Sequence, residues 1–200
     1  MIVFYGSPMS SAVRTHWMLE EVGVPYDYKR ISLRDGDNKK PEFLAVSPGG
    51  KIPCLVDGDV TLTESMAINF YLAEKYGKGL MPDDLVQRAH VYEWSFWTIT
   101  NVQPLILAIL LNTMIRPEGE RDMKAVDAAR QQIPAYLDFL DRALHGKEYL
   151  VGNRFSVADL NAASVIGLGS FVGVDFGAYP SMQAWLNRVQ GRPSFAKAMG

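Results

Sequence analysis

Residues 51–65 read KIPCLVDGDVTLTES, and this stretch decides the fold. Two runs of strand-forming residues, Lys51–Val56 and Val60–Thr63, stand on either side of an Asp-Gly-Asp tripeptide. A tight turn between strands needs a residue that accepts a positive φ, and Gly58 does so without steric cost. The stretch therefore predicts a β-hairpin, and the Glu-Ser pair at its end predicts the start of a helix.

Upstream of the hairpin, short strand-like runs alternate with helical ones, as expected of βαβ construction. Strands are predicted at residues 2–5 and 26–33, and helices from about residue 11 to the capping Gly23, at 42–46, and from 64 to about 77. The polar run 34–40 is predicted to be a mobile loop. These elements predict an α/β domain over residues 1–77.

Beyond a linker at residues 78–84, the strand signal disappears. A long apolar helix is predicted at 85–114, with a disturbance at Pro104, which cannot donate a backbone hydrogen bond. Further helices are predicted at 121–144, 157–168 and 181–190, with a short turn after Pro193. The sequence thus predicts a second, all-helical domain over residues 85–200.

Composition excludes several classes of function. The 20 Lys and Arg residues nearly balance 22 Asp and Glu residues and are scattered, so no basic stripe invites nucleic acid. The single cysteine, Cys54, excludes an intramolecular disulfide framework, and three scattered histidines leave no closed zinc site. No uninterrupted apolar run is long enough to span a membrane and no basic leader precedes the first strand, so we expect a cytoplasmic protein without membrane insertion.

The first candidate site is the loop Gly6–Ser11, which brings three hydroxyl groups to the start of the first helix. A helix N-terminus has free amides and a positive dipole end, so a serine there can cap the helix or help to hold an anion. Spacing alone favours capping, because serine is common at that position.

The second candidate is the segment Ser47–Val56. It is not a phosphate-binding P-loop, because Ile52 stands where a Ser or Thr would hold magnesium. Pro53 cannot donate to a strand ladder, which predicts a position at a sheet edge. The backbone of Ile52 would then be open to an extended ligand.

The third candidate is the pair Glu64 and Ser65 at the entrance to a helix. A carboxylate there can bind an ammonium group, while the hydroxyl and the helix amides can bind a carboxylate. The pair suits the zwitterionic end of an α-amino acid, with helix capping as the alternative interpretation.

These motifs resemble the cytosolic glutathione transferase superfamily, in order and over nearly the whole chain. They are Ser-Pro-x-Ser before the first helix, Gly-Lys-Ile-Pro at 50–53, Glu-Ser at 64–65 and Phe-Ser-Val-Ala-Asp-Leu at 155–160. The resemblance implies a thioredoxin-like N-terminal domain and an all-helical C-terminal domain. It also implies a cis peptide before Pro53, pairing of Ile52 with the cysteinyl backbone of glutathione, and recognition of the γ-glutamyl end by Glu64 and Ser65.

The first motif is similar to the serine-type classes, theta, phi and delta, and suggests a bacterial member. In those classes a hydroxyl activates the glutathione thiol, which points to Ser10, with Ser11 as the main rival and Ser7 as a weaker one. Serine-type members often hold the glycine carboxylate with a histidine that this chain lacks, and Lys51 and Lys39 are the candidate replacements.

The implied function is conjugation of the glutathione thiolate to a small hydrophobic electrophile, with glutathione as co-substrate and no metal. Met9, Trp97 and Met114 are expected in the pocket for the second substrate. The alternatives are a glutathione-dependent reductase, peroxidase or isomerase, and a non-catalytic binding module of the same fold. The apolar stretch 102–111 favours a homodimer, and Ser156 with Asp159 resembles a capping box, which predicts a structural role for Asp159.

Overall fold

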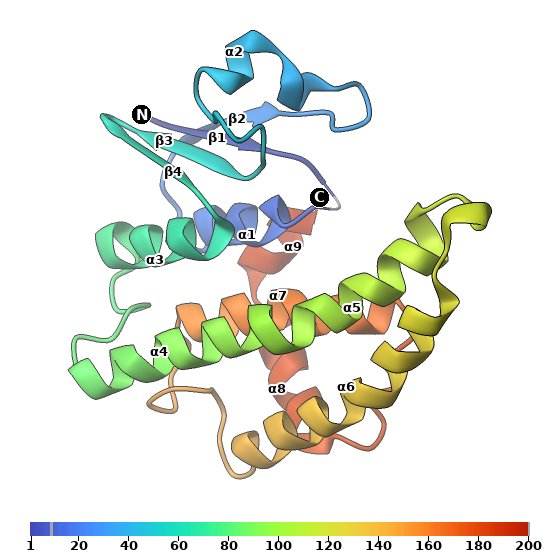
Figure 1. Ribbon diagram of the computed structural model, residues 1–200. Helices are drawn as coiled ribbons and strands as arrows, with labels where there is room; N and C mark the ends of the chain where they lie inside the picture. Colours follow the sequence, from blue (N-terminus) through green and yellow to red (C-terminus); the bar gives the residue numbers. More distant parts are fainter. Residues whose placement is uncertain (9, 200) are drawn as a thin grey trace. The chain divides into compact units, whose positions relative to one another are not determined.

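The computed structural model describes residues 1–8 and 10–199. They form two compact units (Figure 1). One comprises Met1–Pro82 together with the segment from Gly191 onward, and the other comprises Asp83–Gln190. The first is an α/β unit and the second is all-helical, so the predicted fold class is confirmed.

The first unit contains a four-stranded mixed sheet with the order β2-β1-β3-β4. Its strands are β1 (Ile2–Gly6), β2 (Tyr26–Arg30), β3 (Cys54–Asp57) and β4 (Val60–Thr63). The strands β1 and β2 are parallel, whereas β1 with β3 and β3 with β4 are antiparallel. Gly58 between β3 and β4 has a φ of 61°, so the hairpin predicted around it is confirmed.

Two helices, α1 (Ala12–Val22) and α3 (Ser65–Tyr76), pack against each other on one face of this sheet (Figure 1). The short α2 (Pro41–Leu44) lies on the other face, where Phe43 is buried with Ile31 and Cys54. The helix α1 ends at Gly23, whose φ of 67° places it in the left-handed region. The predicted cap is therefore confirmed.

A polar cluster ties the hairpin to α3. One carboxylate oxygen of Asp57, at the end of β3, accepts hydrogen bonds from the Tyr71 hydroxyl at 2.8 Å, the Lys75 ammonium at 2.8 Å and the Tyr76 hydroxyl at 2.6 Å. We call these three side chains the α3 donors. Burial raises the pKa of Asp57, but the hydrogen bonds from the α3 donors outweigh it and lower that pKa to about 2.

One local prediction in this unit is wrong. Pro53 is not at a sheet edge, because β3 lies between β1 and β4. The strand begins only at Cys54, so the proline interrupts no ladder. The run 34–40 contains a 3₁₀ turn, η1 (Asp37–Lys39), and the Asn38 amide donates a 2.8 Å hydrogen bond to the Gly50 carbonyl.

The C-terminal helix α9 (Pro193–Met199) belongs to the first unit, where it packs against α1. The Trp17 indole N–H donates to the Ser194 hydroxyl at 3.1 Å, and the Trp17 and Phe195 rings lie 4.7 Å apart. Glu21 accepts hydrogen bonds from the Arg192 guanidinium. The sequence analysis places α9 in the helical domain, residues 85–200, because nothing local to this segment signals a contact with α1.

The second unit is built around one 31-residue helix, Leu85–Ile115. It runs through α4 (Leu85–Trp97), the π-helical segment η2 (Thr98–Val102), α5 (Gln103–Leu110) and a second π-helical segment, η3 (Leu111–Ile115). The segment η2 ends just before Pro104, so the disturbance predicted there is present. Beyond it come η4 (Glu118–Glu120), α6 (Met123–Leu144), α7 (Val157–Phe171) and α8 (Pro180–Gln190).

By length and composition alone, the helix Leu85–Ile115 could cross a membrane. Its most apolar 18 residues have a mean hydropathy of 1.5, and 33% of them are buried. The core helix of a soluble protein meets the same criteria. Here Val91, Val102 and Ile109 are fully buried, and the helix packs against α6 and α7.

The capping box predicted at the start of α7 is confirmed. One carboxylate oxygen of Asp159 accepts a 2.9 Å hydrogen bond from the Ser156 N–H and a 3.1 Å hydrogen bond from its hydroxyl. The other oxygen accepts from the Leu150 N–H at 2.9 Å and from the Trp185 indole N–H at 2.8 Å. Burial raises the pKa of Asp159, and these donors oppose that shift.

Candidate functional site

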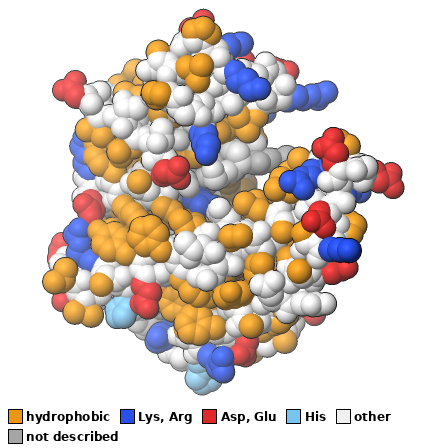
Figure 2. Space-filling view, viewed as in Figure 1, with side chains coloured by type: hydrophobic (Ala, Val, Ile, Leu, Met, Phe, Trp, Pro, Cys, Tyr) orange, Lys and Arg blue, Asp and Glu red, His pale blue; other side chains and the backbone are white. Residues whose placement is uncertain are grey.

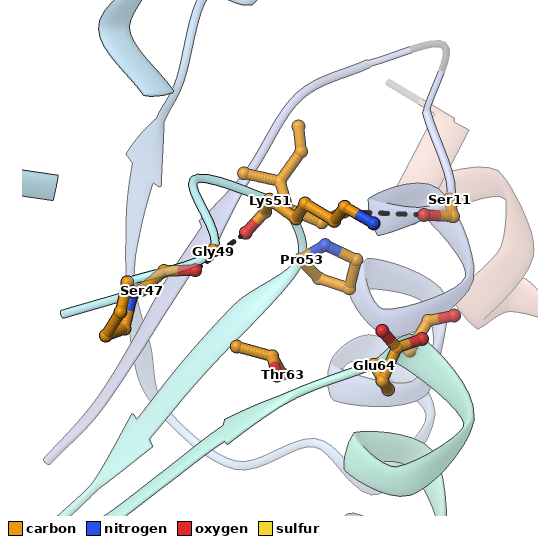
Figure 3. Close-up of a pocket in the computed structure, with 10 residues that line it drawn as sticks. Ser11, Ser47, Gly49, Lys51, Pro53, Thr63 and Glu64 are labelled. Carbon is orange, nitrogen blue, oxygen red and sulfur yellow. Dashed lines mark hydrogen bonds between the residues drawn. The ribbon is translucent and has the colours of Figure 1, made fainter. Parts of the chain in front are cut away.

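The candidate site is a pocket of about 410 Å³ in the first unit. Figure 3 shows Ser11, Pro53 and Glu64 around this hollow, with Lys51 above it in the view. Most of its lining comes from the loop before β3 and from the junction of β4 with α3. The lining residues are Ser11, Ser47, Pro48, Gly49, Lys51, Ile52, Pro53, Thr63, Glu64 and Ser65.

One wall is the turn that leads into β3. The peptide bond between Ile52 and Pro53 is cis, as the resemblance implies. The Ile52 carbonyl accepts a 3.5 Å hydrogen bond from the Ser11 hydroxyl, and among the described residues the Ile52 N–H has no acceptor. This backbone can therefore pair with a ligand although it does not lie on an edge strand.

The loop before this turn has a defined shape. The Ser47 hydroxyl donates a 3.0 Å hydrogen bond to the Lys51 carbonyl (Figure 3). Gly50 has a φ of 59°, and a Cβ atom there would lie 2.9 Å from the Asn38 carbonyl oxygen. Only glycine fits both conditions without strain, so these contacts position Lys51 at the rim of the pocket.

The opposite wall is formed by Glu64 and Ser65. Glu64 is exposed and has a φ of 68°, a conformation that costs a non-glycine residue about 1–3 kcal/mol. Ser65 is the first residue of α3 and is only 7% exposed. The free amides of the first turn of α3 lie at the same end, so this wall combines a carboxylate with groups that bind an anion.

The two candidate serines differ in their contacts. The Ser10 hydroxyl donates to the Ser7 carbonyl at 2.8 Å and accepts from the Ala12 N–H at 3.2 Å. The Ser10 carbonyl accepts a hydrogen bond from the Val13 N–H, so Ser10 caps the N-terminus of α1. Ser11 is exposed and lines the pocket, whereas Ser10 does not line it.

Both halves of the chain match known families. Residues 1–74 match the family model for the glutathione S-transferase N-terminal domain, and residues 102–193 match the model for its C-terminal domain. Glutathione S-transferase 3 of Zea mays is 34% identical over 98% of this chain and 91% of its own length. GstB of Escherichia coli K12, also a glutathione S-transferase, is 32% identical over 100% of this chain and 98% of its own.

The chain belongs to the glutathione transferase superfamily. A solved relative agrees with this assignment. The theta class glutathione S-transferase of Xanthomonas axonopodis pv. citri, crystallised with glutathione bound, has a TM-score of 0.90 and 33% identity, and the match covers 99% of this chain and 96% of that one.

Of the remaining predicted site residues in this glutathione transferase superfamily member, some line the pocket and others do not. Lys51 lines the pocket, whereas Lys39 is exposed in η1 and does not line it. In the helical unit, the Trp97 ring lies 5.4 Å from that of Trp94, and Met114 is 51% exposed. Met9 lies outside the described residues. The shared role of Met9, Trp97 and Met114 in a second-substrate pocket stays a prediction.

Sequence reasoning missed one residue behind the pocket. Arg14 of α1 is only 7% exposed, and its Nη1 donates a 3.3 Å hydrogen bond to the Ser65 hydroxyl. Burial lowers the pKa of Arg14 to about 10. The available signal was its spacing, because Arg14 lies three and four residues before the buried Trp17 and Met18 and so shares their helix face.

Among residues 1–8 and 10–199, no group of three or more His, Cys, Asp or Glu side chains is arranged to hold a metal ion. The single thiol, Cys54, is fully buried in the core between β1 and β4, and burial raises its pKa. A buried thiol with a raised pKa is a poor nucleophile.

Proposed function

We propose that this protein is a glutathione transferase that binds glutathione in the 410 Å³ pocket and directs its thiolate at small hydrophobic electrophiles. One observation carries the proposal: the open Ile52 backbone beside a cis proline lines the same pocket as Glu64 and Ser65. An extended peptide with a zwitterionic end fits this combination. The glutathione bound in the theta class relative supports it.

The proposed placement assigns each part of glutathione to one wall. Glu64 binds the ammonium group of the γ-glutamyl end, and Ser65 with the α3 amides binds its α-carboxylate. The cysteinyl backbone pairs with Ile52. Lys51 holds the glycine carboxylate, because it lies at the rim of the pocket whereas Lys39 does not.

Ser11, rather than Ser10, is proposed to activate the thiol. The resemblance points to Ser10, but the Ser10 hydroxyl is engaged in capping α1. The Ser11 hydroxyl lies 3.5 Å from the Ile52 carbonyl, next to the backbone that would hold the cysteinyl residue. A hydroxyl at this place can donate a hydrogen bond to the sulfur of the bound cysteinyl residue instead of to the carbonyl.

The available interactions supply enough free energy to lower the thiol pKa of bound glutathione. A free thiol has a pKa of about 8.5, and lowering it by about two units needs about 2.7 kcal/mol. One hydrogen bond to a charged group supplies about 1.5–3 kcal/mol. The N-terminus of α1 adds about 0.3–1 kcal/mol. The thiolate then attacks an electrophilic carbon and forms a carbon–sulfur bond, either as halide leaves an aryl halide or as the enolate formed from an enone takes up a proton from solvent.

The binding test is a calorimetric titration of glutathione into the wild type, Glu64→Ala and Ser65→Ala. Each variant is expected to weaken binding about tenfold. Thr61→Ala is the matched control, because Thr61 is exposed on β4 and does not line the pocket. Unchanged affinity in both site variants would show that glutathione does not bind in this pocket.

The activity test uses an aryl halide, an enone and an organic hydroperoxide, with analysis of the products. Glutathione conjugates are expected from the first two compounds. Glutathione disulfide formed only with the hydroperoxide would indicate a peroxidase instead. Tight glutathione binding without any turnover would indicate a binding module of the same fold.

We further propose that the protein is a cytoplasmic homodimer. Figure 2 shows hydrophobic side chains gathered on the face of the helical unit that carries α4. Leu85, Val86 and Phe96 of this helix are 78%, 63% and 51% exposed, and Phe139 of α6 is 47% exposed. Large exposed apolar groups of this kind favour association. Light scattering is expected to give twice the chain mass, and Phe96→Glu is expected to reduce it.

A further inference from the structure

Behind the Glu64 and Ser65 wall, α1 and α3 are joined by a buried polar contact. The Arg14 Nη1 donates a 3.3 Å hydrogen bond to the Ser65 hydroxyl oxygen. The Asn69 amide of α3 donates a 3.3 Å hydrogen bond to the Arg14 carbonyl. All three side chains are buried, being 7%, 7% and 0% exposed for Arg14, Ser65 and Asn69. Two bonds therefore hold Arg14 and α3 in one arrangement.

The Arg14 bond leaves the Ser65 proton free of Arg14. A guanidinium has only donors, so the Ser65 oxygen must be the acceptor. A serine hydroxyl carries a single proton, and this one is not used in the bond to Arg14. Because Ser65 lines the pocket, its proton is left to donate to a ligand there.

The positive charge of Arg14 also favours donation from the Ser65 hydroxyl to an anion. The Arg14 side chain is positively charged at neutral pH even after burial has lowered its pKa to about 10. It lies against the first residue of α3, a 12-residue helix whose N-terminus carries the positive end of the helix dipole. The Ser65 hydroxyl therefore lies in a positive potential, which favours an anion as its acceptor.

We propose that Arg14 is a positioning residue that makes Ser65 a dedicated hydrogen-bond donor to the α-carboxylate of the γ-glutamyl group. Arg14 does not itself line the pocket and acts through Ser65. The inference rests on the proposed function, since it concerns the same glutathione site. It adds a residue outside the pocket lining, Arg14, that sets how strongly the pocket prefers a γ-glutamyl peptide to one that lacks the α-carboxylate.

The test compares two ligands, glutathione and 4-aminobutyryl-cysteinylglycine, which is glutathione without its α-carboxylate. The wild type is expected to bind glutathione about ten- to a hundredfold more tightly than the analogue. Arg14→Met is expected to reduce this ratio about tenfold, by weakening glutathione while leaving the analogue within twofold. In a Ser65→Ala background, Arg14→Met is expected to change the ratio less than twofold, because its partner is gone.

Two further variants keep the test decisive. Arg30→Met is the control for loss of a positive charge in the same unit, because Arg30 is exposed at the end of β2 and does not line the pocket. It is expected to leave the ratio unchanged. Arg14→Gln replaces Arg14→Met if the latter does not fold. The same fall in the ratio is expected, because the glutamine side chain is neutral and too short to contact the Ser65 hydroxyl.

Equal weakening of both ligands by the Arg14 variants would show a purely structural role and overturn the inference. An undiminished effect of Arg14→Met in the Ser65→Ala background would overturn it as well, because Arg14 would not act through Ser65. Failure of the proposed function is seen separately, in the wild type: a protein that binds glutathione no better than the analogue, or not at all, has no γ-glutamyl site of this kind.

Discussion

Replacing Asp159 by alanine removes the acceptor for four hydrogen bonds in the interior of the helical unit. The carboxylate is 0% exposed and accepts from the N–H groups of Leu150 and Ser156, the Ser156 hydroxyl and the Trp185 indole. In Asp159→Ala, three N–H donors from three segments of the chain lose their partner. Asp159 is fully buried, so these donors lose their acceptor inside the unit and their desolvation is no longer compensated.

The expected loss of stability follows from these donors. Each buried unsatisfied donor costs about 1–3 kcal/mol. Removing the carboxylate returns part of this, because burial of Asp159 disfavours its charged form and raises its pKa. The net loss in the free energy of unfolding is expected to be about 3–5 kcal/mol, the lower part of the sum for three such donors.

Asp122→Ala is the matched control. Asp122 also caps a helix, through a 3.1 Å hydrogen bond from the Ala125 N–H at the start of α6, but it is exposed. An exposed cap is worth about 1 kcal/mol. Urea unfolding followed by circular dichroism measures both variants. A difference between them below about 1 kcal/mol would refute the reasoning, since burial and the extra donors are all that distinguish the two residues.

Three other outcomes are expected. Ser11→Ala is expected to lower turnover about ten- to a hundredfold and to raise the thiol pKa of bound glutathione, measured by ultraviolet titration. Ser10→Ala is expected to keep turnover and to lose about 1 kcal/mol of stability. The reverse result would assign the catalytic role to Ser10. The pKa of Asp57 is about 2 in the folded state against a reference value of 3.8, so its bonds to the α3 donors stabilise the fold above pH 3.8 and this contribution is lost as the pH falls toward 2. In Asp57→Asn, the free energy of unfolding is therefore expected to fall less between about pH 4 and pH 2 than in the wild type. Gly50→Ala is expected to weaken glutathione binding, because its Cβ would lie 2.9 Å from the Asn38 carbonyl oxygen at a φ of 59°; unchanged binding would show that the loop relaxes freely.

Features with a local physical cause were predictable from the sequence. The turn at Gly58, the end of α1 at Gly23 and the capping box at Ser156 each depend on a few neighbouring residues. The membership of Glu64 and Ser65 in one pocket with Ile52 followed from the resemblance rather than from spacing. Local chemistry and family pattern together therefore supplied most of the fold and most of the pocket lining.

Features with a distant cause were not predictable in the same way. The central position of β3 depends on its pairing with β1, about fifty residues earlier in the chain, and Pro53 alone suggests the opposite. The choice between Ser10 and Ser11 depends on which hydroxyl meets the Ser7 carbonyl. Arg14 is buried where α1 packs against α3, an element about fifty residues later in the chain.

The docking of α9 on α1 has a consequence for chain connectivity. Because α9 completes the unit that begins at Met1, the helical unit Asp83–Gln190 is an insertion within the first unit. A nascent chain that has emerged only as far as Pro82 lacks the partners of Trp17 and Glu21. The face of α1 that α9 covers stays uncovered by α9 until the whole insertion has been synthesised, so the first unit is expected to start folding first and to finish last.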